Sequence, residues 1–367
     1  MQNLVNILII NQYASTPENG IGGRHFHLGQ HLARMGHRVT IVSGGWHHLL
    51  LDNTGSVAET ELIEERFTFV RVRLPKYAGA HSFRRILNWF LFAFKSLFIL
   101  EHLKKLGIGN PDYVIYSSPS PIGSLSAYLT AKRARAAFIF EVRDIWPLSL
   151  QVMGSFSKFN PLLILMKGIE IASYRLSNLV ISNLEGFKDY LTDNHYRNHG
   201  FSWIPNGVEQ VNAEIPTSRI NREFFTVGYA GSLGLANSMD VLIKAAHLLN
   251  QRPQIRFVIV GDGPVKGALE AMCADLKLTN VEFRSPIPKS EVPILLSEFD
   301  ICFLSWRDSP LYTYGIAANK IFDYMAAGKP ILQCYGGRYD PVTRHGAGVT
   351  VPPGDPIALA EAIERLC

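Results

Sequence analysis

The chain has 367 residues, 47% of them hydrophobic and 18% charged, with 36 Lys and Arg against 31 Asp and Glu. This length predicts two domains with full-sized cores, and this composition excludes a disordered, fibrous or coiled-coil protein. The charge is uneven, because residues 1–205 hold 21 basic and 14 acidic side chains, and residues 66–105 hold nine basic residues and one acid, Glu101. We therefore expect an electropositive side on the first half that suits phospholipid, nucleic acid or a phosphorylated substrate.

The cysteines and the N-terminus indicate a cytosolic protein. All four cysteines lie in the second half and form no Cys-x-x-Cys pair, which argues against a zinc site or disulfide framework. The short apolar run that ends at Asn11 has no basic residues before it, so it predicts a buried strand and not a signal peptide. No stretch reaches the roughly 20 apolar residues that a membrane-spanning helix needs.

Strands and helices alternate along both halves of the chain. In the first half we expect strands at 5–10, 39–43, 113–116, 138–142 and 179–182, with helices at 25–35, 124–136 and 162–174. In the second half we expect strands at 224–229, 256–260 and 301–304, with helices at 238–250, 265–276 and 319–327. A turn cluster at 203–208 interrupts the pattern. The sequence therefore predicts two doubly wound α/β domains, residues 1–205 and 206–367, with parallel sheets.

Three glycine turns follow predicted strands, at residues 20–24, 228–234 and 261–264. Open parallel sheets bind ligands beyond the carboxyl ends of their strands, where such turns open onto helix N-termini. The first turn lacks the dinucleotide fingerprint, because His25 stands where the third glycine should be, and it lacks the lysine of a P-loop. Each could be an ordinary tight turn. A glycine loop after the first strand of each domain nevertheless favours a phosphorylated ligand held in a cleft between them.

The segment 305–330 carries the sharpest signal. An irregular loop leads to a predicted helix that begins near Asn319 and Lys320, with Asp323 one turn further in. Free amides and a lysine at a helix start favour a diphosphate, and the carboxylate can accept hydrogen bonds from ribose hydroxyls. The alternative is that Asp323 caps or solvates a helix turn and Lys320 lies on the surface.

This segment resembles the nucleotide-sugar signature of retaining glycosyltransferases of family 4, which have the two-domain GT-B fold. The resemblance covers nearly the whole chain, through the stretches Gly22-Gly23, Ile204-Pro-Asn-Gly207, Tyr229-Ala-Gly231-Ser-Leu-Gly234, Val260-Gly-Asp-Gly-Pro264 and Phe322-Asp323-Tyr-Met-Ala-Ala-Gly-Lys-Pro330. Glu141-Val-Arg-Asp144-Ile-Trp-Pro147 and Asp308-Ser-Pro-Leu-Tyr312 are similar to a bacterial branch that works on O-antigen and capsule sugars and includes N-acetyl-L-fucosaminyltransferases.

The resemblance implies a GT-B fold with two Rossmann-like domains facing a central cleft, and it implies a donor site. The implied nucleotide-sugar-binding residues are Gly22, Gly23, Arg24, Gly231, Ser232, Gly263, Asn319, Lys320 and Asp323. Asp323 takes the place of the glutamate that binds ribose, and Gly315 stands where the family has its other glutamate. The stretch 232–237 has no basic residue, so Lys320 and backbone amides would neutralise the diphosphate, helped by Arg24 of the first domain.

A second implied group, Glu141, Arg143 and Asp144, follows the predicted strand 138–142, where the family often has a histidine-aspartate pair. Asp144 would face the reacting sugar or the acceptor hydroxyl and could take a proton. The alternative is a buried arginine–carboxylate pair that ties the strand end to a neighbouring loop. No nucleophile is evident, so we expect same-face substitution without a covalent intermediate. We expect no metal, because no Asp-x-Asp occurs.

Residues 86–100 include twelve apolar residues in fifteen, with Arg84, Asn88, Lys95 and His102 on one narrow stripe of a predicted helix. Such a helix is either packed against its domain or lies in a membrane interface. The basic pairs at its ends favour an anionic membrane surface contacted through residues 84–105.

The resemblance implies a retaining, metal-independent transferase that needs no cofactor beyond its donor, a nucleotide sugar carrying UDP. The expected acceptor is a polyprenyl-diphosphate-linked saccharide, and the expected location is the inner face of the cytoplasmic membrane. No nucleic-acid motif is present. Two alternatives stay open: an enzyme resembling UDP-N-acetylglucosamine 2-epimerase, and a non-catalytic partner subunit of the same fold.

Overall fold

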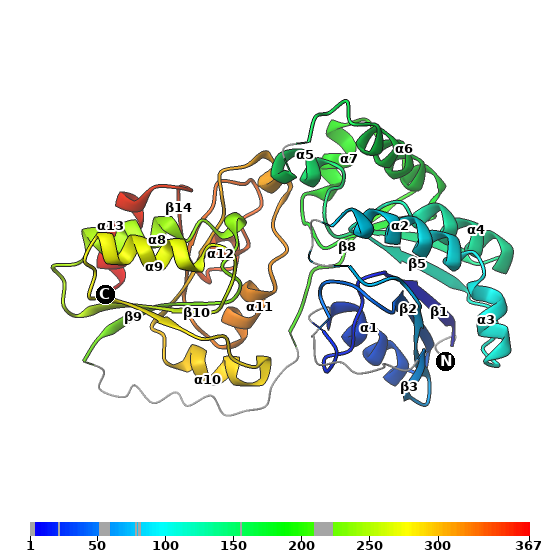
Figure 1. The fold of residues 1–367 in the computed structure, drawn as a ribbon, viewed down its shortest axis with the longest axis horizontal. Helices are drawn as coiled ribbons and strands as arrows, with labels where there is room; N and C mark the ends of the chain where they lie inside the picture. The colour runs from blue at the N-terminus through cyan, green and yellow to red at the C-terminus, as the bar shows by residue number, and fades with distance from the viewer. Residues whose placement is uncertain are drawn as a thin grey trace. The chain divides into compact units, whose positions relative to one another are not determined.

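The computed structural model describes residues 4–20, 23–50, 59–77, 79, 82–154, 156–208 and 223–367. The chain divides into two compact units, Met1–Pro205 and Asn206–Cys367. Each unit is a mostly parallel sheet with helices on its faces (Figure 1). Gly22 lies outside the described residues.

The described part of the first unit contains an eight-stranded sheet in the order β3-β4-β2-β1-β5-β6-β7-β8. Its strands are β1 (Asn6–Ile10), β2 (Arg38–Gly44), β3 (Thr60–Glu64), β4 (Phe67–Val72), β5 (Tyr113–Ser117), β6 (Ala137–Val142), β7 (Leu179–Ser182) and β8 (Phe201–Trp203). Neighbours pair in parallel except β3 and β4, which form an antiparallel hairpin. The central strands are buried on both faces, as their continuous apolar runs predict, whereas the hairpin of β3 and β4 was not predicted.

Helices cover both faces of this sheet. They are α1 (Gly23–Arg34), α2 (Phe83–Ser96), α3 (Ile99–Lys105), α4 (Ser124–Ala134), α5 (Leu148–Gly154), α6 (Pro161–Leu176) and α7 (Phe187–Asp193). Right-handed crossovers place α2, α4 and α6 on one face and α1 on the other (Figure 1). One core cluster joins α1 to the sheet through Phe26, Phe67 and Phe69, and another joins α2 to α6 through Trp89 and Met166.

The prediction of a single helix over residues 86–100 is wrong. The chain forms α2 and α3 instead, bent by 56° between Ser96 and Ile99. On the predicted polar stripe, Arg84 and Lys95 are exposed, whereas Asn88 is fully buried and donates to the Pro75 carbonyl at 2.8 Å. Among the described helices none is long and apolar enough to cross a membrane alone, although α2 and α3 together meet the length and composition criteria.

The described part of the second unit contains a six-stranded parallel sheet in the order β11-β10-β9-β12-β13-β14. Its strands are β9 (Phe225–Ala230), β10 (Ile255–Val260), β11 (Val281–Arg284), β12 (Ile301–Ser305), β13 (Ile331–Cys334) and β14 (Gly348–Val351). Its α-helices are α8 (Asp240–Leu248), α9 (Lys266–Asp275), α10 (Val292–Ser297), α11 (Asn319–Ala326), α12 (Pro341–Arg344) and α13 (Pro356–Leu366). β9 and β12 lie at the centre, so their carboxyl ends present the Gly231 turn and the irregular segment before α11 at one edge of the sheet.

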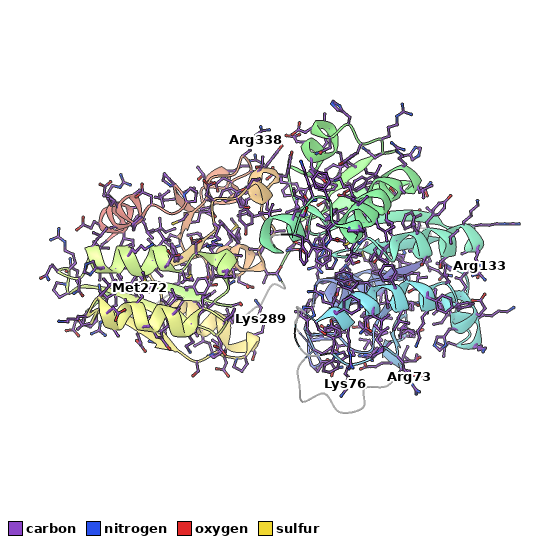
Figure 2. The ribbon with its side chains drawn as sticks, turned by 45° about the horizontal axis from the view of Figure 1, so that its top comes forward. Arg73, Lys76, Arg133, Met272, Lys289 and Arg338 are labelled. Atoms are coloured by element: carbon purple, nitrogen blue, oxygen red, sulfur yellow. The ribbon has the colours of Figure 1, made fainter. Side chains whose placement is uncertain are left out.

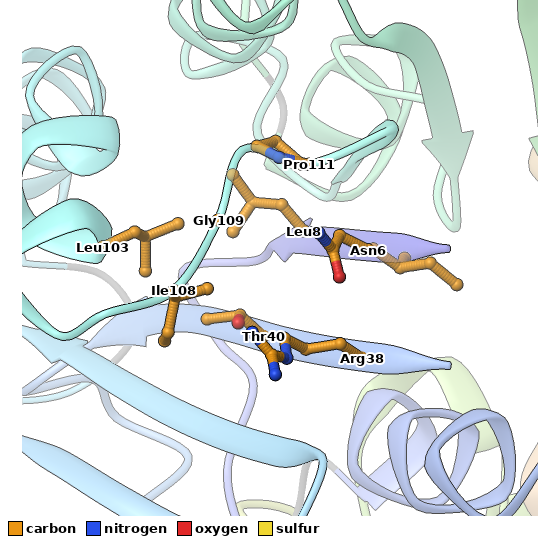
Figure 3. A pocket seen from close by; sticks show the side chains of 9 residues that line it. Asn6, Leu8, Arg38, Thr40, Leu103, Ile108, Gly109 and Pro111 are labelled. Atoms are coloured by element: carbon orange, nitrogen blue, oxygen red, sulfur yellow. The ribbon is translucent and has the colours of Figure 1, made fainter. Parts of the chain in front are cut away.

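A small hollow lies at the opposite, amino end of the first sheet (Figure 3). Asn6 and Arg38, at the starts of β1 and β2, line it together with Leu103 and Pro111. Its volume of about 10 Å³ suits a single water molecule at most. This hollow is therefore too small for a substrate.

Candidate functional site

Two glycine loops interlock at the carboxyl ends of β9 and β10. Gly231, Gly261 and Gly263 have φ angles of 147°, 148° and 158°. The Gly231 amide donates to the Val260 carbonyl at 2.8 Å. A Cβ on Gly261 would lie 1.9 Å from the Gly231 carbonyl oxygen, and a Cβ on Gly263 would lie 2.4 Å from that of Leu233. Only glycine fits these positions, so both loops are built for close backbone approach.

Lys320 fills the space over Gly231. A Cβ on Gly231 would lie 2.0 Å from Lys320 Cε and 2.7 Å from its Nζ. The ammonium lies 5.2 Å from the centre of the Tyr229 ring, and no described residue accepts a hydrogen bond from it. Burial lowers the pKa of Lys320, and the nearby charge of Asp323 opposes that shift. The Lys320 ammonium is thus half-buried beside a glycine loop and has no anion hydrogen-bonded to it. Such a cation is suited to binding a phosphate group.

The start of α11 adds backbone donors to this site. Its N-cap residue is Ala318, which has no side chain to cap the first amides. Asn206 holds the preceding segment by donating to the Ala317 carbonyl at 2.7 Å. Gly315, buried and with a φ of 105°, supplies no side chain where the family has its first glutamate. The free amides favour an anion at this helix start.

Asp323 lies one turn into α11 and forms an ion pair with Lys289, which is labelled in Figure 2. The Asp323 side chain is 14% exposed and that of Lys289 is 69% exposed. The ion pair involves one carboxylate oxygen, Oδ2, and a carboxylate has lone pairs for further donors such as ribose hydroxyls. Lys289 was not predicted as part of this site, because it lies 34 residues from Asp323 along the chain.

Two other predicted donor residues border this site. Asn319 is exposed at the first position of α11. Ser232 is exposed, and its carbonyl accepts hydrogen bonds from the Tyr229 hydroxyl and the Asn237 amide, both at 2.6 Å. These bonds fix the turn that follows Gly231.

In the first unit, Glu141 at the end of β6 belongs to a buried ion-pair network. Arg24 donates from Nε and Nη2 to Glu141 Oε1 at 3.1 and 3.0 Å, and His25 Nε2 lies 2.7 Å from Oε2. Burial opposes ionisation of Glu141, but His25 and Arg24 outweigh it and hold the pKa of its carboxyl far below the usual range. Glu141 is 1% exposed, so its carboxylate holds the protein together and is not positioned to take a proton from substrate.

Arg24 also binds the end of the first unit, donating to the Pro205 carbonyl at 2.7 Å and the Ile204 carbonyl at 2.9 Å. We expected Arg24 to help neutralise a diphosphate, but these bonds and Glu141 occupy its guanidinium. His25, read in the sequence only as a break in a glycine fingerprint, is a buried partner in this network. Gly23 is the first residue of α1, and a Cβ there would lie 3.2 Å from the His27 ring.

Arg143 and Asp144 differ from Glu141 in their surroundings. Arg143 donates its backbone amide to Ser118 Oγ at 2.9 Å, and its buried Nε has no partner among the described residues. No ion pair joins Arg143 to Glu141 or Asp144 in the described part of the chain, so the buried arginine–carboxylate pair at this strand end is made by Arg24 and not by Arg143. Asp144 is exposed. Burial of its carboxyl group raises the pKa of Asp144, and the charge of Arg143 opposes that shift.

Family models match both units of the chain. The model described as Glycosyltransferase Family 4 matches residues 19–210, and the model described as Glycosyl transferases group 1 matches residues 225–367. The chain belongs to glycosyltransferase family 4. No cluster of three His, Cys, Asp or Glu side chains that could hold a metal ion is found in the residues described by the structure.

The chain shares partial similarity with curated relatives. It is 32% identical over 136 residues to TuaH of Bacillus subtilis (strain 168), a glycosyltransferase named for teichuronic acid biosynthesis. This match covers 35% of the chain and 33% of TuaH, and the other curated relatives are also covered over less than half their length.

Solved structures establish the fold over almost the whole chain. Sucrose-phosphate synthase from Thermosynechococcus elongatus superposes with a TM-score of 0.73 at 18% identity, covering 99% of this chain and 89% of that one. Anabaena HepE, solved with UDP-glucose, superposes with a TM-score of 0.65 at 17% identity, covering 98% and 89%. The predicted GT-B fold is confirmed.

Proposed function

We propose that this glycosyltransferase moves a sugar from a nucleotide-sugar donor, a UDP-sugar, to a polyprenyl-diphosphate-linked saccharide. The transfer takes place during bacterial surface polysaccharide synthesis. The observation that carries the proposal is the Lys320 ammonium packed over Gly231, beside an uncapped helix start and one turn before Asp323. UDP is favoured because HepE of the same fold was solved with UDP-glucose, and the biosynthetic role agrees with the name of TuaH.

In the proposed donor complex, Lys320 and the amides at the start of α11 bind the diphosphate. Asp323 accepts hydrogen bonds from the ribose hydroxyls, while Gly231 leaves room for the Lys320 side chain and Gly263 allows the two loops to pack together. The similarity to N-acetyl-L-fucosaminyltransferases favours an N-acetylated amino sugar or a deoxy sugar as the transferred group.

The proposed reaction is a same-face substitution without metal. The bond between the anomeric carbon and the diphosphate oxygen breaks, and the acceptor oxygen bonds to the same face of that carbon. The acceptor proton passes to the departing diphosphate oxygen, whose charge Lys320 and the helix amides stabilise. Exposed Asp144 orients the acceptor hydroxyl or the reacting sugar.

We also propose that the enzyme works at the inner face of the cytoplasmic membrane, which it contacts through residues 84–105. A lipid-linked acceptor remains anchored in the bilayer, so a transferase that uses it gains from residing there. The nine basic residues against one acid over 66–105 favour an anionic surface.

The test is product formation by the purified chain supplied with UDP-sugars and a lipid-linked saccharide. We expect a new glycoside whose anomeric configuration, read by NMR, matches that of the donor. Asp144→Asn should slow its formation, whereas Asp240→Asn, which changes an exposed ion pair on α8, should not. Conversion of UDP-N-acetylglucosamine without a glycoside would instead support the epimerase, and neither transfer nor donor hydrolysis would support the partner subunit.

A further inference from the structure

Asn206 is a buried residue at the point where the chain enters the second unit. Its Nδ2 donates to the Ala317 carbonyl at 2.7 Å, across 111 residues of sequence, and the residue is only 6% exposed. Ala317 directly precedes Ala318, the N-cap of α11, the helix that carries Lys320. This hydrogen bond therefore ties the entry of the chain to the candidate donor site.

The backbone before Asn206 is held in place by the first unit. The Ile204 amide donates to the Ser182 carbonyl at 2.8 Å, and Arg24 donates to the carbonyls of Ile204 and Pro205. The ring of Pro205 fixes one more backbone angle. The Asn206 side chain thus extends from a backbone with little freedom, so its hydrogen bond forms with a small loss of conformational entropy.

The Ala317 carbonyl and the Ala318 amide belong to one peptide group. That group is planar and trans, so its N–H points in the direction opposite to its C=O. By holding the carbonyl, Asn206 therefore also fixes the direction of the Ala318 amide. Neither this amide nor those of Asn319 and Lys320 donate to an acceptor among the residues that the structure describes. Three successive amides at the start of α11 can thus bind an anion.

We propose that Asn206 is a positioning residue for the diphosphate of the nucleotide-sugar donor. Its hydrogen bond to the Ala317 carbonyl orients the Ala318 amide, and with it the start of α11, toward the phosphate oxygens that Lys320 neutralises. Asn206 acts through the backbone of Ala317, so it is not a catalytic residue. This role rests on the proposed donor site, for which Asn206 was not predicted.

A hydrogen bond of the same kind elsewhere in the second unit provides a matched control. Asn280 Nδ2 donates to the Ala246 carbonyl of α8 at 3.0 Å. Asn280 lies at the amino end of β11, whereas the start of α11 lies at the carboxyl edge of the same sheet. Asn280→Ala therefore removes one bond between an asparagine and a distant carbonyl without changing the helix start.

The first measurement uses the purified full chain without any ligand. Amide chemical shifts of residues 318–320 are read by NMR in selectively labelled protein. Asn206→Ala should move these shifts, and Asn206→Asp should move them further, because an ionised carboxylate cannot donate and repels the Ala317 carbonyl. Asn280→Ala should leave them in place. Unchanged shifts in both Asn206 variants would overturn the positioning role, whether or not the chain binds a nucleotide.

The second measurement compares binding of UDP with binding of uridine, which lacks the diphosphate. UDP affinity should fall roughly 5- to 20-fold in Asn206→Ala, because an amide–phosphate hydrogen bond is misaligned, and it should fall further in Asn206→Asp. Uridine affinity, read by ligand-observed NMR, should change by less than about twofold, since uridine has no phosphate for these amides. Asn280→Ala should bind both ligands as the original chain does.

A role of Asn206 limited to packing or stability predicts different results. UDP and uridine would then weaken together, or Asn206→Asp, which keeps the shape of the side chain, would be milder than Asn206→Ala. Either result would overturn the proposal. Failure of the original chain to bind UDP, with shifts that still move at 318–320, would instead overturn the proposed donor site and with it the diphosphate as the bound anion. UDP binding that both Asn206 variants leave unchanged would overturn the role of Asn206 alone.

Discussion

Replacing Gly231 by alanine should weaken nucleotide binding by displacing Lys320. The added Cβ would lie 2.0 Å from Lys320 Cε, so the lysine must withdraw by about 1.4 Å to reach an ordinary 3.4 Å contact. Moving the ammonium that far breaks a charge-assisted hydrogen bond to phosphate, worth roughly 1.5–3 kcal/mol. UDP affinity should therefore fall roughly 10- to 100-fold.

The assay is calorimetric titration of UDP into the variant, with thermal unfolding measured alongside. The backbone at Gly231 has a φ of 147°, so alanine there also costs roughly 1–3 kcal/mol of stability. Gly234→Ala is the matched control in the same loop, because its φ is −101° and the nearest atom to its new Cβ is 3.8 Å away. The control should bind UDP as the original chain does.

A double-mutant cycle decides whether the effect passes through Lys320. In a Lys320→Ala background the clash is gone, so Gly231→Ala should change UDP affinity little. If Gly231→Ala weakens binding equally in both backgrounds, or in neither, the reasoning about Lys320 is refuted.

Three further changes test the other groups. Asp144→Asn should lower turnover roughly 100-fold while UDP affinity stays the same, because the acceptor hydroxyl or the reacting sugar is then misplaced, and unchanged turnover would remove Asp144 from the reaction. Glu141→Gln should lower stability to urea by roughly 3 kcal/mol, because the buried Arg24 loses its carboxylate partner; an unchanged urea midpoint would refute the network's structural role. Burial lowers the pKa of His47 to about 4 from 6.5, so the stability that depends on its neutral form is complete above pH 6.5 and is lost as the pH falls. This loss should reach about 3 kcal/mol near pH 4 and should be absent in His47→Gln, and equal pH profiles for the two proteins would contradict it.

Most of the sheet could be predicted from the sequence because its signals are local. Continuous apolar runs mark β1, β6, β10 and β12, and the glycines after β9 and β10 mark turns that only glycine can form. The start of α11 at Asn319 also follows from neighbouring residues.

The rest depends on contacts between residues far apart in the chain. Glu141 is 117 residues from Arg24 and 116 from His25, so nothing near Glu141 reveals that its carboxylate is already engaged. The Lys289–Asp323 pair was hidden for the same reason. The prediction of one helix over residues 86–100 missed the 56° bend between α2 and α3, because the apolar composition continues through the bend and does not mark it.

The central claim is that the second unit binds the nucleotide of the donor. Its most direct test is calorimetric titration of UDP, GDP and ADP into the purified chain and into Asp323→Ala. The account predicts micromolar binding of UDP in preference to the other two, lost in the variant. Absence of binding to any nucleotide, or UDP binding that Asp323→Ala leaves unchanged, would contradict it.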